Sequence, residues 1–506
     1  MIEKRLSQDS MSQATRPRPG SGAAGFVTGS KRLSQNSRPQ ATRPRPGRGA
    51  AGFVTGCKTF LLTDLYQLTM LQGYRHERMN ELAVFELFVR KLPTERNFLV
   101  AAGLAQAVDY LQQVQLTEEE ADYLKTTGFF EPEFVDWLGT LRFRGDVDAM
   151  PEGTVFFPNE PILRVTAPLA EAQLVETRLI NLLQFQTMVA SKAARCAMAA
   201  PDRTLVEFGL RRAHGAEAGL LAARASCLAG FTGTSNVMAG RLFDLPIFGT
   251  MAHSYIMAHD DELEAFLGFA RSQPANVVLL IDTYDTLAAV PKVIRAAEIL
   301  QREEISIKAV RIDAGDLGDL AKQVRTELDR AGWPDIRIFA SGDLDEWKLR
   351  SLVQQQQAPI DGFGVGTRLT TSHDAPYLNC AYKLEEYAGI ARRKVSTGKQ
   401  TYPGRKQVFR RTGADGKWEL DVLGLAGEDL PGEPLLVPIM REGVPVAEAE
   451  SVESIRRRTL RQLERLPDAL RRLEPAGSPF PLELSAGLQQ LIRETDLRLG
   501  LVESTS

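Results

Sequence analysis

The chain has 506 residues, a formal net charge of -3 at pH 7 and a hydrophobic fraction of 43%. This composition excludes a collagen, a mostly disordered chain and a histone-like polycation. The longest apolar run, residues 277–281, is much shorter than the ~18 to 20 residues of a membrane-spanning helix, so we expect no membrane segment. At roughly 150 residues per domain, the length predicts about three units, or one large barrel with additional segments.

The charge is unevenly distributed along the chain. Residues 1–57 hold ten basic residues against Glu3 and Asp9, a charge of +8, and subtracting it from -3 leaves -11 for residues 58–506. An acidic body argues against a large nucleic-acid-binding face, which would need clustered Lys and Arg. The four cysteines have neither a metal-site spacing nor a disulfide framework, which favours a reducing cytoplasm.

The basic leader, residues 1–57, contains an internal repeat. Residues 4–30 and 31–57 align without gaps, and both read KRLSQ, QATRPRPG and GAAGFVTG. Such a Pro-, Gly- and Arg-rich segment has too few apolar residues to offset the entropy of ordering, so we expect a disordered tail or an incorrectly assigned start. An organelle-targeting signal is the alternative, but the RPRPG blocks would break the amphipathic helix that it requires.

Periodic apolar patterning begins near Phe60. It predicts helices, the first capped by Thr63 or Asp64, at residues 61–73, 104–113, 118–126, 131–139 and 171–199. It predicts strands at residues 83–89, 98–100, 153–156 and 162–165. We expect residues 58–185 to form an N-terminal α+β lobe.

The middle of the chain has a more regular pattern. Buried-type strands are predicted at residues 205–208, 245–249, 276–281, 309–312, 336–339 and 361–365. The last four start about 25 to 33 residues apart, which is the length of a strand plus a returning helix. We therefore expect residues 186–375 to form the catalytic domain of an α/β protein, an irregular, TIM-like parallel barrel.

The C-terminal part, residues 376–506, has shorter elements. Strands are predicted at residues 394–396, 407–411 and 418–422, and an Arg-rich helix at residues 452–465. We expect this segment to complete the α+β lobe and to add a helical appendage.

The active site of a parallel barrel lies at the C-terminal ends of its strands. Charged or phosphate-binding residue types follow each predicted strand there: Glu207, Arg211, Thr250, His253, Asp282, Asp285, Arg311, Asp313, Asp316, Ser341, Gly342, Gly364, Gly366 and Thr367. Helix caps would explain one Asp or Ser per loop, but not the arginines and the histidine.

Two of these strand ends suggest specific chemistry. The string GFGVGT at residues 362–367 lets backbone approach a ligand closely and, with Ser341 and Gly342, matches the usual phosphate site of such barrels, although a tight turn explains the string equally well. His253 is either a loop residue or a nucleophile or acid/base. Metal binding by His253 and His259 would lack a third ligand at a typical spacing.

Seven ordered motifs resemble the nicotinate phosphoribosyltransferase family. They are TDLYQLTM at 63–70, EFGLRRAHG at 207–215, GTSNVMAG at 233–240, GTMAHS at 249–254, RIDAGDL at 311–317, GFGVGTRL at 362–369 and K-x-S-x-x-K-x-T-x-P-G-x-K-x-V-x-R at 394–410. The resemblance extends from about Thr59 to beyond Arg410. It implies that nicotinate and 5-phosphoribosyl 1-diphosphate react to nicotinate mononucleotide and diphosphate, with Mg²⁺ present and with coupled ATP hydrolysis.

The resemblance also implies roles for individual residues. His253 would be transiently phosphorylated by ATP. Arg311 would pair with the nicotinate carboxylate, and Thr250 would contact the same substrate. Tyr66 would stack on the pyridine ring from the neighbouring subunit of a homodimer with shared active sites.

Further roles concern the phosphoribosyl group. Asp313 and Asp316 would lie near the ribose hydroxyls and Mg²⁺, with Asp313 and Glu207 as catalytic carboxylates, while the metal ligands themselves stay unassigned. Arg211 would offset the charge of the diphosphate. The 5-phosphate would be bound by Ser341, Gly342, Gly364, Gly366 and Thr367. His214 stands where some relatives have a neutral polar residue, and it is given no role.

Three alternatives stay open at this point. An enzyme of the same fold could use nicotinamide, which has no carboxylate to pair with Arg311, or quinolinate, which has two. A phosphate-binding barrel could serve as a regulatory module, although it would usually have lost His253 or an Asp. A Schiff-base aldolase is disfavoured because no Lys follows the predicted strands.

Overall fold

A computed structural model of the chain describes residues 60–501. The basic leader lies outside the described residues. The buried apolar side chains of the described part form two large clusters, one built mainly from residues 189–369 and the other mainly from residues 60–188 and 378–488. The candidate site belongs to the first cluster.

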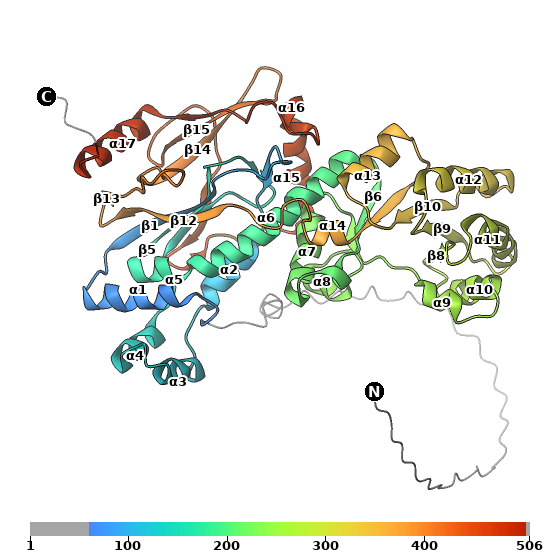
Figure 1. The fold of residues 1–506 in the computed structure, drawn as a ribbon, viewed down its shortest axis with the longest axis horizontal. Helices are drawn as coiled ribbons and strands as arrows, with labels where there is room; N and C mark the ends of the chain where they lie inside the picture. The colour runs from blue at the N-terminus through green and yellow to red at the C-terminus, as the bar shows by residue number, and fades with distance from the viewer. Residues whose placement is uncertain (1–59, 502–506) are drawn as a thin grey trace, which may run out of the picture. The chain divides into compact units, whose positions relative to one another are not determined.

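The first cluster surrounds a six-stranded parallel sheet in the order β7-β6-β11-β10-β9-β8 (Figure 1). Its strands are β6 (Thr204–Glu207), β7 (Gly233–Thr234), β8 (Val277–Leu280), β9 (Ile307–Ile312), β10 (Arg337–Ser341) and β11 (Gly362–Val365). Most of their side chains are buried on both faces, as in sheets covered by crossover helices. All six strands run parallel, so their carboxyl ends lie at one edge.

The parallel sheet is a half-barrel, whereas the sequence predicted an irregular, TIM-like barrel. Within residues 60–501, no strand pairing joins the outer strands β7 and β8. The strand predicted at residues 245–249 is reduced to a single bridge between Ile247 and Thr234. Pro246 has no N–H to donate, and the exposed Ile247 and Phe248 lack the burial of a central strand, so the ladder stops after one bridge.

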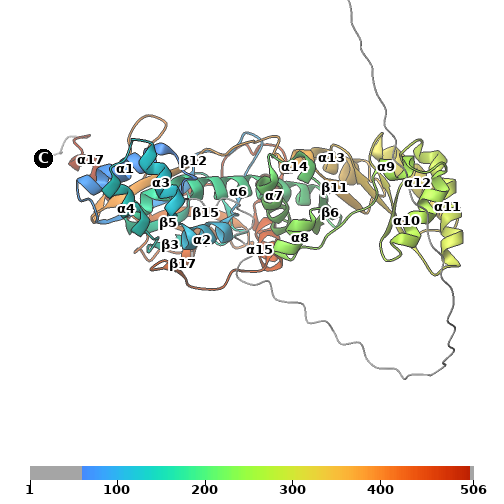
Figure 2. The ribbon, with the colours of Figure 1, turned by 90° about the horizontal axis from the view of Figure 1, so that it is seen from below.

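Helices follow the strands and cover the sheet (Figure 2). They are α7 (Ala216–Leu228), α8 (Val237–Phe243), α9 (His253–Met257), α10 (Glu262–Ser272), α11 (Thr286–Gln301), α12 (Leu317–Arg330), α13 (Glu346–Arg350), continued by a π-helical turn at Ser351–Gln355, and α14 (Thr367–Thr370). Asp285, Asp316 and Asp345 are the N-caps of α11, α12 and α13, and each side chain accepts a hydrogen bond from a first-turn N–H.

The second cluster surrounds a mixed set of sheets. The seven-stranded sheet has the order β13-β12-β1-β5-β3-β17-β18, with all its pairs antiparallel. Its strands are β1 (Leu82–Val89), β3 (Asp146–Ala149), β5 (Pro161–Pro168), β12 (Cys380–Tyr387), β13 (Ile390–Ala391), β17 (Val437–Arg441) and β18 (Val444–Pro445). N-terminal and C-terminal parts of the chain therefore share one sheet.

The remaining strands form two smaller sheets. The four-stranded sheet contains β14 (Lys406–Thr412), β15 (Trp418–Leu425), β16 (Glu433–Pro434) and β19 (Leu482–Leu484), and the two-stranded sheet contains β2 (Leu99–Val100) and β4 (Val155–Phe156). The strand predicted at residues 394–396 is irregular backbone in the structure. It has no partner among the described strands, and its residues are exposed.

The remaining helices are α1 (Leu65–His76), α2 (Leu104–Gln113), α3 (Glu118–Thr126), α4 (Pro132–Thr140), α5 (Leu169–Leu174), α6 (Glu176–Ala199), α15 (Val452–Arg465), α16 (Asp468–Arg471) and α17 (Ala486–Arg498). The helix predicted at residues 171–199 is divided at Val175. Asp64 stands at the N-cap of α1, but its side chain accepts from Thr177 instead of capping. No helix within the described range is long and apolar enough to cross a membrane.

Candidate functional site

Arg311 is the centre of a polar network at the carboxyl edge of the half-barrel. It is the fifth residue of β9, and its side chain is 16% exposed. Its guanidinium donates to Ser341 Oγ, Thr250 Oγ1 and Asp313 Oδ1, each at 2.9 Å. The guanidinium also lies over the Phe208 ring, 5.6 Å from the ring centre. These contacts fix its plane and use three of the five N–H groups of a guanidinium, which leaves two for a ligand.

Asp313 lies two residues beyond Arg311 and is also held firmly. Its Oδ1 accepts from Ser341 Oγ and from Arg311, and its backbone N–H donates to Asp282 Oδ2 at 2.8 Å. Burial alone would raise the pKa of the Asp313 carboxyl. The hydrogen bonds from Ser341 and Arg311 and the nearby Arg311 and His253 charges outweigh burial, so the pKa lies below its ordinary value. Asp313 is therefore ionised at neutral pH.

His253 faces the same carboxylate from the start of α9. Its Nδ1 lies 3.2 Å from Thr283 Oγ1, and its Nε2 lies 3.9 Å from Asp313 Oδ2. The side chain is 41% exposed, so a ligand can reach the ring. Thr250, Thr283, His253 and Asp313 come from three different strand ends, and the structure brings them together around Arg311.

The turn after β10 packs closely against this group. Gly342 has φ +103°, and a Cβ atom there would lie 1.9 Å from the Asp313 carbonyl oxygen. Only glycine combines this left-handed backbone with so close an approach. Gly364 lies on the neighbouring strand β11, and Gly366 directly follows that strand. Cβ atoms at these two positions would lie 2.4 Å from the Phe208 ring and 3.1 Å from the Phe208 carbonyl oxygen, respectively. Ser341 and the three glycines therefore lie on two adjacent strand ends, and Thr367 follows them in an exposed position.

Glu207, expected from the sequence to be a catalytic carboxylate, is the last residue of β6. Its side chain is buried, and it accepts from Thr234 Oγ1 at 2.6 Å, from Thr370 Oγ1 at 3.1 Å and from the Gly209 N–H. Burial raises the pKa of this carboxyl against those hydrogen bonds. The contacts join the ends of β6 and β7 to α14.

Three other expected site residues lie apart from the Arg311 network. Asp316 Oδ1 accepts from the Asp319 N–H as the cap of α12, and Asp316 is exposed. Arg211 is exposed in the short 3-10 turn after β6. Tyr66 is 48% exposed on α1, whose buried residues Leu68 and Leu71 belong to the second core cluster. Within this single chain, Tyr66 is not brought to Arg311 by any described hydrogen bond or ring contact.

Two polar residues of the site received no role from the sequence. Asp282 is the second residue after β8, and its Oδ1 is buried without a hydrogen-bond partner, while Oδ2 accepts from the Asp313 N–H. Arg368, the second residue of α14, connects the last two strand ends through Asp343 and Asp345. The signal for Asp282 was its place directly after an apolar run, but the role of Arg368 depends on contacts that the sequence does not reveal.

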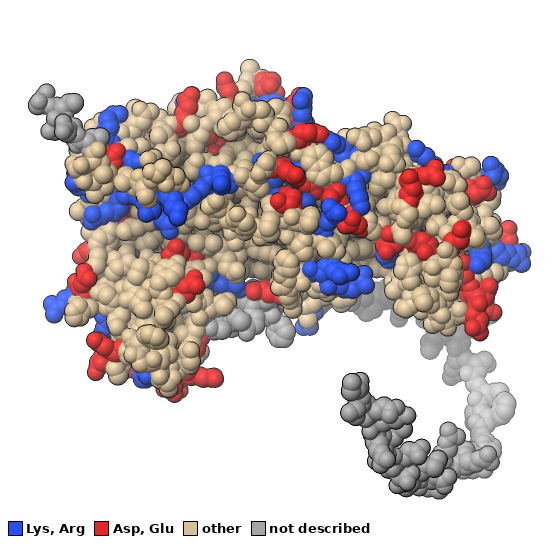
Figure 3. All heavy atoms as spheres, viewed as in Figure 1, with Lys and Arg blue, Asp and Glu red and all other residues tan. Residues whose placement is uncertain are grey.

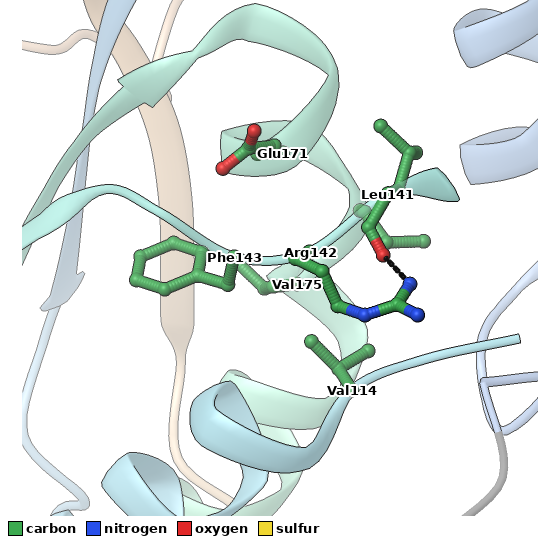
Figure 4. A pocket seen from close by; sticks show the side chains of 7 residues that line it. Val114, Leu141, Arg142, Phe143, Glu171 and Val175 are labelled. Carbon is green, nitrogen blue, oxygen red and sulfur yellow. Dashed lines mark hydrogen bonds between the residues drawn. The ribbon is translucent and has the colours of Figure 1, made fainter. Parts of the chain in front are cut away.

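Away from the Arg311 network, the surface and a small hollow of residues 60–501 have a different character. On the face drawn in Figure 3, most of the surface belongs to residues other than Lys, Arg, Asp and Glu, and the charged side chains lie in smaller groups. A small, mainly apolar hollow lies away from the strand ends and is lined by Val114, Leu141, Arg142, Phe143, Glu171, Leu174 and Val175 (Figure 4). Across residues 60–501, no group of three or more His, Cys, Asp or Glu side chains is arranged to hold a metal ion.

Comparison with known proteins gives matches along most of the chain. Three domain descriptions match in order: the nicotinate phosphoribosyltransferase (NAPRTase) N-terminal domain at residues 61–184, the NAPRTase family at residues 204–401 and the NAPRTase C-terminal domain at residues 430–492. A nicotinate phosphoribosyltransferase of Mycobacterium tuberculosis is 50% identical over 426 residues, covering 84% of this chain and 91% of the relative. One of Bacillus subtilis is 43% identical over 358 residues, covering 69% and 72%.

Solved structures agree with these matches. Human nicotinic acid phosphoribosyltransferase has a TM-score of 0.78 at 30% identity, covering 86% of this chain and all of the human chain. A nicotinate-nucleotide pyrophosphorylase from Pyrococcus furiosus has a TM-score of 0.64 at 26% identity, covering 84% and 98%. The mixed α/β fold with its parallel half-barrel is therefore shared with these proteins.

Proposed function

Because the chain belongs to the nicotinate phosphoribosyltransferase family, we propose that it joins nicotinate to 5-phosphoribosyl 1-diphosphate, giving nicotinate mononucleotide and diphosphate. The reaction is the entry of nicotinate into NAD biosynthesis. Hydrolysis of ATP through a phosphohistidine accompanies the transfer, with Mg²⁺ as the metal. A cytoplasmic location fits such an enzyme of nucleotide metabolism.

The observation that carries this proposal is the way Arg311 is held. Thr250, Ser341 and Asp313 fix the guanidinium and leave two N–H groups unused. Two N–H donors of a fixed guanidinium match the two oxygens of one carboxylate. Nicotinate carries one carboxylate, nicotinamide carries none, and quinolinate carries a second that would need a further cation. The site therefore favours nicotinate among the three pyridines.

His253 is the proposed site of phosphorylation. When its Nδ1 donates to Thr283, Nε2 carries the lone pair. Nε2 attacks the γ-phosphorus of ATP, the bond to the β-γ bridging oxygen breaks, and ADP leaves. Water later hydrolyses the phosphoimidazole to inorganic phosphate and a free ring. The phosphorylated state favours tight substrate binding, so ATP shifts the population of binding-competent enzyme.

The transfer itself needs charge stabilisation around the ribose. Its transition state is oxocarbenium-like, and the ionised Asp313, which we assign as the catalytic carboxylate, supplies negative charge beside the ribose. Mg²⁺ bound to the diphosphate would offset the charge of the leaving group. The buried, unpartnered Oδ1 of Asp282 fits a ligand to that ion or to a ribose hydroxyl. Asp316, three residues after Asp313, would also lie near the ribose hydroxyls and Mg²⁺.

Two anionic parts of the substrate remain to be placed. Ser341, Gly342, Gly364, Gly366 and Thr367 would bind the 5-phosphate through backbone N–H and hydroxyl groups. Arg211 would face the diphosphate, and the buried Glu207 would hold the turn before it. Tyr66 would reach the pyridine from the neighbouring subunit, so the homodimer is the functional unit.

The direct test incubates purified protein with phosphoribosyl diphosphate, Mg²⁺ and ATP, and compares nicotinate, nicotinamide and quinolinate. Turnover of phosphoribosyl diphosphate should be fastest with nicotinate, and its product should be nicotinate mononucleotide. Faster turnover of nicotinamide or quinolinate would show that the substrate is wrongly assigned.

The phosphohistidine is tested separately with ATP labelled at the γ-phosphate. His253→Ala should lose labelling and ATP stimulation while keeping slow transfer, and His259→Ala, six residues away, is the control that should keep both. Labelling that persists in His253→Ala would exclude His253 as the site of phosphorylation.

A further inference from the structure

We propose that Arg368 is a positioning residue that clamps the two strand-end turns of the phosphate site together and so sets the affinity for the phosphoribosyl group. The inference deepens the proposed function and rests on it. Arg368 lies just beyond the GFGVGT segment, as the second residue of α14. Its partners Asp343 and Asp345 belong to the other turn, after β10.

The contacts are those of a clamp between two turns. Arg368 Nε donates to Asp343 Oδ1 at 2.8 Å and its NH2 group donates to Asp343 Oδ2 at 3.1 Å, which is a bidentate pair. The NH1 group donates to Asp345 Oδ2 at 3.2 Å. All three guanidinium nitrogens are therefore engaged by the turn after β10. A flexible single contact would not fix the distance between the turns, whereas a planar fork on two carboxylates does.

The turn after β10 needs such support because its backbone is unusual. Gly342 has φ +103° and Asp343 has φ +46°, so two consecutive residues lie in the left-handed region. A non-glycine residue adopts that region at a cost and persists there when its surroundings hold it. On one side, Gly342 packs on the Asp313 carbonyl and Ser341 bonds to Arg311. On the other side, Arg368 holds the Asp343 carboxylate.

The same contacts balance charge beside the 5-phosphate. Asp343 and Asp345 carry two negative charges next to a proposed anion site, and Arg368 and Lys348, which donates to Asp343 at 3.1 Å, carry two positive charges. The two cations lower the pKa of Asp343 to about 2, so the carboxylate stays ionised throughout the working pH range. Without Arg368, Lys348 alone would offset the two carboxylates, and the turn after β10 would lose its contact with α14.

The test separates a clamp from a direct phosphate ligand. Arg368→Ala should raise the KM for phosphoribosyl diphosphate and the Kd for ribose 5-phosphate, measured by calorimetry, by about tenfold, and should leave the KM for nicotinate within about twofold. Asp343→Asn replaces the carboxylate by an amide of nearly the same size. It should also raise the Kd for ribose 5-phosphate, because it breaks the bidentate pair. The double variant should be no weaker than Arg368→Ala, because both changes remove one interaction.

Several outcomes would overturn the clamp. If Arg368 contacts the phosphate itself, Asp343→Asn frees the guanidinium and tightens ribose 5-phosphate binding. Equal loss of affinity for nicotinate and ribose 5-phosphate in Arg368→Ala would indicate general misfolding. Arg350→Ala is the matched control, since Arg350 bonds to Glu474 at 2.6 Å, outside the two turns, and should change neither constant.

The binding measurement also keeps this proposal distinct from the proposed function. A wild-type protein that binds ribose 5-phosphate but forms no nicotinate mononucleotide would refute the enzyme assignment, and the clamp would then be judged on the calorimetry alone. A wild-type protein that does not bind ribose 5-phosphate would refute the clamp.

Discussion

Arg311 combines the two properties that a carboxylate-binding residue needs, a fixed plane and unused donors. Its three partners come from two other strand ends and from its own strand. The surrounding residues therefore determine the orientation of the guanidinium before any ligand binds, so little side-chain entropy is lost on binding. Lys could supply the charge at this position but not the planar fork.

Arg311→Lys should lower kcat/KM for nicotinate by about 10²- to 10³-fold, because a bidentate charged pair is replaced by a single contact. The loss should appear mainly in the KM for nicotinate. Steady-state kinetics with nicotinate and nicotinamide in parallel measure it, and the preference for nicotinate should fall with the substitution. Arg295→Lys, an exposed arginine on α11, is the control. An unchanged preference would mean that Arg311 does not bind the carboxylate.

At the scale of elements, the site is a consequence of parallel strands that end at one edge. Apolar runs in the sequence located five of the six strands, and the residues after them were correctly expected to lie at strand ends. The predicted bounds of the helices at 104–113, 118–126 and 452–465 agree with α2, α3 and α15. Strong local periodicity made these predictions possible.

Other elements depended on partners far away in the sequence. β3 pairs with β17, almost 300 residues later, and neither was predicted, because short strands have little local pattern. The strand at 245–249 was wrongly predicted because two of its apolar residues, Ile247 and Phe248, are exposed, although Leu245 is buried. The clamp at Arg368 could not be predicted either, since the left-handed backbone of Asp343 appears only in the fold.

The turn after β10 gives a prediction for Gly342. Gly342→Ala should destabilise this turn by about 1 to 3 kcal/mol, because alanine is strained at φ +103° and its Cβ would meet the Asp313 carbonyl at 1.9 Å. Gly342→Ala should therefore show both a lower melting temperature and a raised KM for phosphoribosyl diphosphate. Gly139→Ala, in α4, where a Cβ atom would meet no neighbour within 4 Å, is the control and should neither lower the melting temperature nor raise the KM. Wild-type behaviour of Gly342→Ala would show that the turn is more open than described.

β12 gives a prediction about pH. Glu385 is buried beside Glu86 and Lys406, and burial, with the Glu86 charge, outweighs Lys406 and Thr401 and raises its pKa to about 8 from 4.5. The folded chain therefore holds a proton that the unfolded chain releases, so this group lowers stability as pH rises from about 4.5 to about 8. Glu385→Gln keeps the neutral form, and should raise the melting temperature at pH 9 with little change at pH 5.

The matched control for Glu385 is its neighbour on β12. Glu386 is half-buried and pairs with Arg405 at 2.7 Å, so Glu386→Gln should not reproduce the gain at pH 9. If the difference in melting temperature between Glu385→Gln and wild type is the same at pH 5 and pH 9, then Glu385 is ionised across this range.

At the scale of the whole molecule, the expected site residues divide between the two core clusters. Arg311 and Asp313 end β9 in the first cluster, whereas Tyr66 lies on α1 in the second. Leu62, Leu65 and Tyr66 are each more than 40% exposed, which is unusual for neighbouring large apolar side chains. A homodimer in which α1 of one subunit completes the site of the other would account for both the separation and the exposure.

Subunit mixing tests this arrangement. Tyr66→Ala and Arg311→Ala should each be nearly inactive alone, because every site in either homodimer lacks one residue. After unfolding and refolding together in equal amounts, half of the dimers should contain one subunit of each kind, and one of their two sites would be intact. Recovery should reach about a quarter of wild-type activity. No recovery from a mixture shown to exchange subunits would mean that Tyr66 and Arg311 of the same chain act in one site, or that Tyr66 acts only through folding.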